Sequence, residues 1–101
     1  MINVDKKYLE IIKDILQKYV PKCEVRLFGS RLTNKIKKYS DMDIVIVGKE
    51  KIKRQTLIRL KEEFENSDIS FRIDVLDWHR TSDSFKKIIE KEYDVIQNPS
   101  I

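Results

Sequence analysis

The sequence predicts a mixed α/β (α+β) protein in which helices flank a small sheet. Helical patterns, with apolar residues three and four positions apart, alternate with short runs rich in β-branched residues. Their order along the chain is α-β-α-β-α-β-α, which favours helices layered on one sheet. The length of 101 residues suits one core, so we expect residues 1–101 to form a single domain.

The first two elements are a helix and a strand. Residues 5–20 place apolar side chains at helical spacing, Asp5 can cap the start, and Pro21 stops the helix. Residues 23–28 alternate between apolar and polar side chains and predict a strand. We expect Cys23 to be a small core residue of this strand.

The middle of the chain predicts a central strand. Residues 30–39 are polar and basic, and Leu32 and Ile36 lie four apart, which favours a short helix. Residues 42–47 are apolar on both faces of a strand, as in a strand buried between two layers, and Gly48 ends the run. The connection between the first two strands is short, so their relative direction stays open.

The C-terminal half repeats the alternation. A second amphipathic helix is expected over residues 51–66 and a third strand over residues 70–77. Ser82 can cap a final helix that ends near Glu92, and the tail from Tyr93 either adds a short strand or packs against the core. The final helix is expected to bury Phe85, Ile88 and Ile89.

Composition indicates a charge-rich soluble protein. The hydrophobic fraction is 41% and the charged fraction 38%, which excludes a disordered chain. Cys23 is the only cysteine, and no segment approaches membrane-spanning length, so we expect a reducing cytoplasmic location and no membrane contact. The net charge of +4 permits contact with a polyanion, but no basic stripe interleaved with aromatic residues predicts direct nucleic-acid binding.

Carboxylates gather at the start of the central strand. Asp41 and Asp43 differ by two positions, which puts both side chains on one face of a strand. Two ionised carboxylates at this distance repel each other unless a cation lies between them, and Mg²⁺ prefers such oxygen ligands together with phosphates. Asp74 lies within the third predicted strand and can face the same point if the two strands are neighbours. Three carboxylates would form a two-metal site for displacement at phosphorus.

A phosphate site is predicted just before this strand. Gly29 permits a tight turn with close backbone approach to a ligand, and Ser30 offers a hydroxyl and an N–H at a helix start. Arg31 can reach a phosphate, although a surface role is about as well supported. Taken singly, Gly29 suits a turn, Ser30 a helix cap and Asp41 a turn after Ser40. The combination carries the hypothesis.

Three further residues have structural interpretations. Asp77 stands at a strand end and is expected in a turn. His79 is the only histidine, and in a loop it is more often structural or exposed than catalytic. Trp78 is expected to pack against the core rather than over a nucleotide or a partner.

The pattern Gly29-Ser30, ten intervening residues and Asp41-x-Asp43, with a later strand aspartate at Asp74, resembles the signature of the polymerase-β-like nucleotidyltransferase superfamily. The resemblance extends over the whole chain. Size and the segment DVLDWHRTSDSFKKIIEKEYDVIQ resemble the minimal nucleotidyltransferases encoded beside HEPN-domain proteins in toxin–antitoxin pairs. The nucleotidyltransferase fold is then implied.

The resemblance implies an activity and roles for these residues. Asp41 and Asp43 would bind two Mg²⁺ ions, and these ions would hold the triphosphate. Asp74 would complete the second metal site and help deprotonate an acceptor hydroxyl. Gly29 and Ser30 would hold the β- and γ-phosphates. The reaction would transfer AMP from ATP to a tyrosine hydroxyl of a HEPN toxin, release pyrophosphate and silence the toxin.

Two alternatives stay open. The acceptor can instead be a small molecule such as an aminoglycoside, although 101 residues leave no room for an acceptor domain. The chain can also neutralise its partner by binding alone, but the presence of all three acids counts against a decayed site. Neither the preferred nucleotide nor homo-oligomer formation follows from the sequence.

Overall fold

The computed structural model describes residues 4–29 and 41–100, and its elements follow the predicted order closely. The helix predicted over residues 30–39, and with it Ser30 and Arg31, lies outside the described residues. No helix within the described ranges is long and apolar enough to cross a membrane. The elements are α1 (Lys6–Tyr19), β1 (Glu24–Phe28), β2 (Met42–Val47), α2 (Arg54–Glu65), β3 (Ile73–Asp77), a 3-10 helix (Trp78–Arg80), α3 (Asp83–Lys91) and β4 (Asp94–Gln97).

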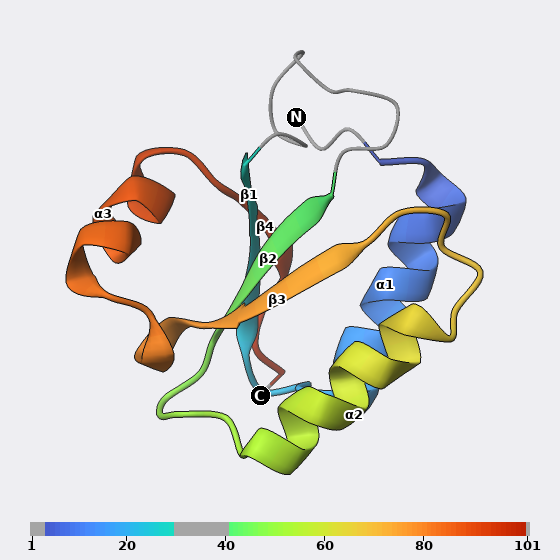
Figure 1. The fold of residues 1–101 in the computed structure, drawn as a ribbon, viewed down its shortest axis with the longest axis horizontal. Coiled ribbons are helices and arrows are strands. Elements are labelled where there is room, and N and C mark those ends of the chain that lie inside the picture. The colour runs from blue at the N-terminus through green and yellow to red at the C-terminus, as the bar shows by residue number, and fades with distance from the viewer. Residues whose placement is uncertain (1–3, 30–40, 101) are drawn as a thin grey trace.

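The four strands form one mixed sheet in the order β3-β2-β1-β4. β1 pairs antiparallel with β2 and with β4, whereas β2 pairs parallel with β3. This settles the direction left open by the sequence, since a short connection suits antiparallel neighbours. The tail forms β4, the strand alternative, and the prediction of a small mixed sheet flanked by helices is confirmed (Figure 1).

The core lies between the sheet and the helix pair α1 and α2, which cover one face together (Figure 1). β2 is buried on both faces for most of its length, as its β-branched run predicts. The inward side chains of α1, β1 and α2 complete this layer. Among the described residues, the fully buried side chains are Ile12, Leu16, Val25, Leu27, Met42, Ile44, Val45, Ile46, Leu60 and, on the other face of the sheet, Ile89 of α3.

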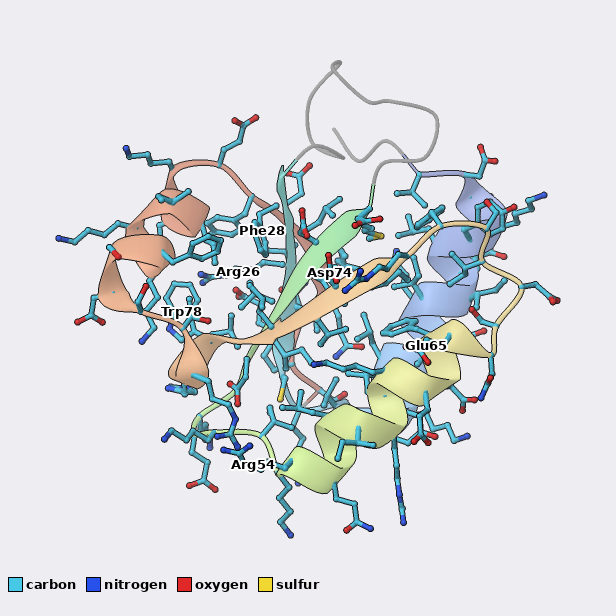
Figure 2. All side chains as sticks on the ribbon, viewed as in Figure 1. Arg26, Phe28, Arg54, Glu65, Asp74 and Trp78 are labelled. Carbon is cyan, nitrogen blue, oxygen red and sulfur yellow. The ribbon has the colours of Figure 1, made fainter. Side chains whose placement is uncertain are left out.

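The other face of the sheet is covered by α3 and the 3-10 helix (Figure 1). Here the Arg26 guanidinium lies 4.4 Å from the ring centre of Tyr93 and 5.1 Å from that of Trp78, and it also forms an ion pair with Glu24. Figure 2 shows Arg26, Phe28 and Trp78 on this side of the sheet. Trp78 therefore packs against the core, as predicted.

Two predictions about helix ends and burial are wrong. Asp5 stands at the start of α1, but its side chain makes no capping hydrogen bond, and its backbone carbonyl accepts from Tyr8 and Leu9 instead. Phe85 and Ile88 are 37% and 58% exposed, whereas Ile89, the third residue expected in the core, is buried. The Ser82 cap is confirmed, since its hydroxyl accepts from the Phe85 N–H.

Candidate active site

The carboxylates meet where β2 and β3 begin. The Met42 N–H donates to the Arg72 carbonyl at 2.9 Å, which starts the parallel ladder. In the register that follows, Asp43 lies directly opposite Asp74. Paired residues of neighbouring strands share a face about 4.8 Å apart. The strands that carry Asp43 and Asp74 are neighbours, as expected. The metal-binding roles of the aspartates stay predictions.

Asp43 is the centre of this group. It is half-buried, whereas Asp41, two residues earlier, is exposed. Burial raises the pKa of the Asp43 carboxyl above its usual value, and the charges of Asp74 and then Asp41 raise it further. Three acids therefore share one negative region in which ionisation of Asp43 is disfavoured. A cation placed there would relieve this repulsion.

Gly29 lies against the same carboxylate. Its φ of +82° is in the left-handed region, which glycine adopts without strain. A Cβ at this position would lie 2.6 Å from Oδ2 of Asp43, closer than van der Waals contact allows. The end of β1 also brings Phe28 opposite Asp43 in the antiparallel register. A larger residue here would be strained and would displace the carboxylate, so the glycine backbone passes close beside Asp43.

The third aspartate is paired in a way that the sequence analysis missed. The Arg72 guanidinium Nε lies 3.0 Å from Oδ1 of Asp74. Arg72 is 75% exposed and Asp74 is 37% exposed, so water screens this ion pair. The signal was available, since residues two apart along an extended chain share a face. Arg72 therefore contacts the Asp74 carboxylate at the solvent-exposed edge of the sheet, where β3 is the last strand.

The carboxylates open into a groove of about 800 Å³. Asp43 and Asp74 line it together with the aromatic rings of Phe28 and Phe85, which meet edge to face at 5.9 Å. Opposite these rings the groove reaches α2, where Lys61 contributes to the wall. The site therefore combines acidic oxygen ligands with apolar surface, in a space large enough for a nucleotide or a peptide segment.

These residues suit a hard divalent cation. Carboxylate oxygens are the ligands that Mg²⁺ prefers, and Mg²⁺ is usually held by one or two carboxylates plus substrate phosphates. Across residues 4–29 and 41–100, no three acidic, histidine or cysteine side chains are already arranged to hold a metal by themselves. Phosphate oxygens would therefore have to complete the coordination at Asp43 and its neighbours.

Asp77 and His79 belong to the other end of the sheet. Asp77 is the last residue of β3 rather than part of a turn, and its side chain is only 1% exposed. It binds the backbone N–H of Ile52 and of His79. His79 Nε2 lies 2.6 Å from the Gly48 carbonyl, so its structural role is confirmed.

Strand-borne aspartates beside a glycine turn on a small mixed sheet are the layout of enzymes that move nucleotidyl groups. The sequence matches the family model of polymerase beta nucleotidyltransferases over residues 10–100. The chain belongs to this family.

Two kinds of relatives extend this finding. The "probable protein adenylyltransferase MntA" of Haemophilus influenzae is 46% identical over 96 residues, which cover 95% of this chain and 84% of that protein. A toxin–antitoxin complex solved with AMP-PNP contains a chain that superposes with a TM-score of 0.76 at 18% identity, over 91% of this chain and 74% of that one.

A second solved complex contains a tri-AMPylated Shewanella oneidensis HEPN toxin and an MNT antitoxin. Its matching chain has a TM-score of 0.72 and 19% identity, over 94% of this chain and 73% of that one. At this level of identity the two solved structures show a shared fold, and the nucleotidyltransferase fold predicted from the sequence is confirmed.

Proposed function

We propose that the chain transfers AMP from ATP to a hydroxyl, most suitably a tyrosine, of a HEPN-domain partner toxin, and so acts as its antitoxin. The observation that carries the proposal is the clustering of Asp41 and Asp74 around Asp43, since their negative charges oppose ionisation of the Asp43 carboxyl. The Haemophilus relative is named a probable protein adenylyltransferase, and a HEPN toxin accompanies the antitoxin of the Shewanella complex. These names support the choice of donor and acceptor.

In this proposal the phosphates of ATP lie between the glycine turn and the start of β2. Gly29, Ser30 and Arg31 bind the β- and γ-phosphates, and Asp41 and Asp43 hold Mg²⁺ together with phosphate oxygens. Bound Mg²⁺, as two ions, would neutralise phosphate charge and favour ionisation of the acceptor hydroxyl. Arg72 orients Asp74, which lies where an acceptor enters from the open side.

The transfer balances without any other reactant. The acceptor oxygen attacks the α-phosphorus of ATP and forms a new oxygen–phosphorus bond. The bond between the α-phosphorus and the oxygen that bridges to the β-phosphate breaks, and pyrophosphate leaves. The hydroxyl proton passes to Asp74 and from there to solvent. The requirement for ATP suits a cytoplasmic location.

Intact-mass measurement of the partner tests this proposal. The HEPN-domain protein proposed as the partner is incubated with the chain, ATP and Mg²⁺. We expect its mass to rise by one or more AMP groups, and the double variant Asp41→Asn/Asp43→Asn to abolish the gain. Asp14→Asn, an exposed acid on α1, is the matched control and should leave the gain unchanged.

The alternatives predict other outcomes. If the double variant still neutralises the toxin in cells and the partner gains no mass, the chain acts by binding alone. If label from ATP appears only on a small-molecule acceptor, the acceptor assignment is wrong while the nucleotidyl transfer stands. EDTA should stop either transfer, because the carboxylates hold the triphosphate only with a cation between them.

A further inference from the structure

β3 has a free edge beside the candidate active site. The strand ends the sheet order β3-β2-β1-β4, and nothing in the described chain pairs with its outer side. Backbone polar groups point alternately to the two sides of a strand, and the Arg72 carbonyl points toward Met42 of β2. The N–H and C=O groups of Ile73 and Val75 therefore point outward. Such an edge is a template for pairing with another extended chain.

The groove of about 800 Å³ follows this edge on both of its faces. On the side of α2 its wall contains Phe64, Ile69 and Phe71, which are buried or half-buried. On the side of α3 its wall contains Phe28 and Phe85. The labelled side chains of Phe28 and of Glu65, another lining residue, lie on opposite sides of β3 (Figure 2). The groove therefore offers two apolar walls with the strand edge between them.

The carboxylates lie inside the same groove. Asp43 and Asp74 line it on the side of α3, while Ile73 and Val75 line it on the side of α2. Successive side chains of an added strand would point alternately to these two sides. One residue would then face Asp74, and its two neighbours would face the wall formed by α2. Lys61 adds a positive charge to the wall on the side of α2, which suits one acidic side chain of the segment there, whereas Arg72 is already paired with Asp74.

We propose that the acceptor protein binds as an extended segment along the free edge of β3, with its hydroxyl residue on the side of Asp74, and with apolar neighbours and an acidic side chain on the side of α2. The inference rests on the proposed function, because it names how that acceptor reaches the carboxylates. Main-chain hydrogen bonds to Ile73 and Val75 hold the segment, and the two walls select its side chains.

Hydrogen exchange tests the docking without any chemistry. The wild-type chain is measured alone and with the proposed HEPN-domain partner, in the absence of ATP. We expect exchange of the outward amides of Ile73 and Val75 to slow by about tenfold or more in the mixture, because new hydrogen bonds protect them. Protection that spares β3 and falls on the exposed side of α3, at Phe85 and Ile88, would overturn the inference.

Two substitutions test the same contact during transfer. Ile73→Pro removes an outward N–H but no hydrogen bond to β2, a position that an edge strand tolerates. Lys61→Glu reverses the charge in the groove, and Arg59→Glu makes the same change on α2 outside it. We expect the first two to raise the KM for the partner about tenfold with unchanged ATP affinity, and Arg59→Glu to leave it unchanged.

The two proposals fail separately. If the wild-type chain adds no AMP to the partner, the proposed function is wrong, whatever the hydrogen exchange shows. If the wild-type chain adds AMP but Lys61→Glu and Ile73→Pro keep the wild-type KM, edge docking is wrong. Should Ile73→Pro fail to fold, Lys61→Glu against Arg59→Glu and the wild-type exchange data decide alone.

Discussion

The two ends of the sheet each hold a partly or fully buried aspartate, and their surroundings are opposite. Asp77, at the end of β3, accepts from the Ile52 N–H at 2.8 Å and the His79 N–H at 3.1 Å, and lies 3.2 Å from Nε of Arg80. Asp43, near the start of β2, faces the negative charges of Asp74 and Asp41 instead. An aspartate at one end of the sheet therefore has hydrogen-bond donors and a cation as partners, whereas the aspartate at the other end faces like charges that disfavour its ionisation.

We propose that this difference separates a carboxylate that stabilises the fold from one that belongs to the reacting site. The partners of Asp77 tie the loop between β2 and α2 to the 3-10 helix, so this carboxylate stabilises the fold. Natural proteins tolerate a cluster of like charges mainly where function requires it. We therefore expect the two aspartates to affect opposite properties when they are changed.

The largest effect is expected on catalysis at Asp43. Asp43→Asn keeps the size of the side chain but removes the charge that would hold Mg²⁺, so AMP transfer should fall by about a thousandfold or more. The unfolding free energy should stay the same or rise. Transfer rates and urea denaturation on the same preparations check both statements, and a variant that unfolds more easily with normal transfer would contradict them.

The largest effect on stability is expected at Asp77. Asp77→Ala leaves two part-buried N–H groups and Arg80 without their acceptor, so the unfolding free energy should fall by about 1–3 kcal/mol. Asp68→Ala, at an exposed position, is the control and should change it by less than about 0.5 kcal/mol. Denaturation midpoints measure the difference. A loss equal to that of the control would show that the network at this end is dispensable.

The two glycines extend the same contrast. At Gly29 an alanine would meet Oδ2 of Asp43 at 2.6 Å in a left-handed conformation, which costs about 1–2 kcal/mol and displaces the carboxylate. At Gly48 the nearest atom is Sγ of Cys23 at 3.1 Å, and the backbone needs no left-handed φ. Gly29→Ala should therefore reduce both transfer and stability, whereas Gly48→Ala should change stability slightly and leave transfer intact.

The smallest effect is a pH dependence of stability without metal. Because the pKa of Asp43 is raised in the folded chain, the folded state holds this proton more tightly than the unfolded state does. That contribution is present below the unfolded pKa of about 3.9 and is lost as the pH rises through the raised folded pKa. Asp43→Asn should therefore gain stability over the wild type as the pH rises above about 4, which urea denaturation at a series of pH values measures.

Local patterns were enough to predict much of the fold. The helical spacing of α1 and the β-branched run of β2 each determine one element, because short-range periodicity and burial point the same way. The pairing of Asp43 with Asp74 also followed, since a motif with fixed spacing placed both acids on strands. These predictions depend only on residues near one another in the sequence or on one recognised pattern.

Long-range packing limited the rest. Phe85 and Ile88 have the spacing of a buried helix face, but how far α3 covers the sheet is set by tertiary packing that the spacing does not contain. Asp77 was expected in a turn, and its buried role was missed, because one partner, Ile52, comes from a loop distant in the sequence. The other, Arg80, lies in the helix that follows. Arg72 was missed for a different reason: it lies two residues from Asp74 along the same extended segment, and only the acids of that segment were considered.

The central claim is that Asp43, and not Asp77, belongs to the reacting site. The most direct measurement is the rate of AMP transfer to the HEPN-domain partner by Asp43→Asn and Asp77→Asn, at a temperature where circular dichroism shows both chains folded. The account predicts that Asp43→Asn loses transfer while Asp77→Asn keeps a rate close to that of the wild type. Equal transfer by the two variants would contradict it.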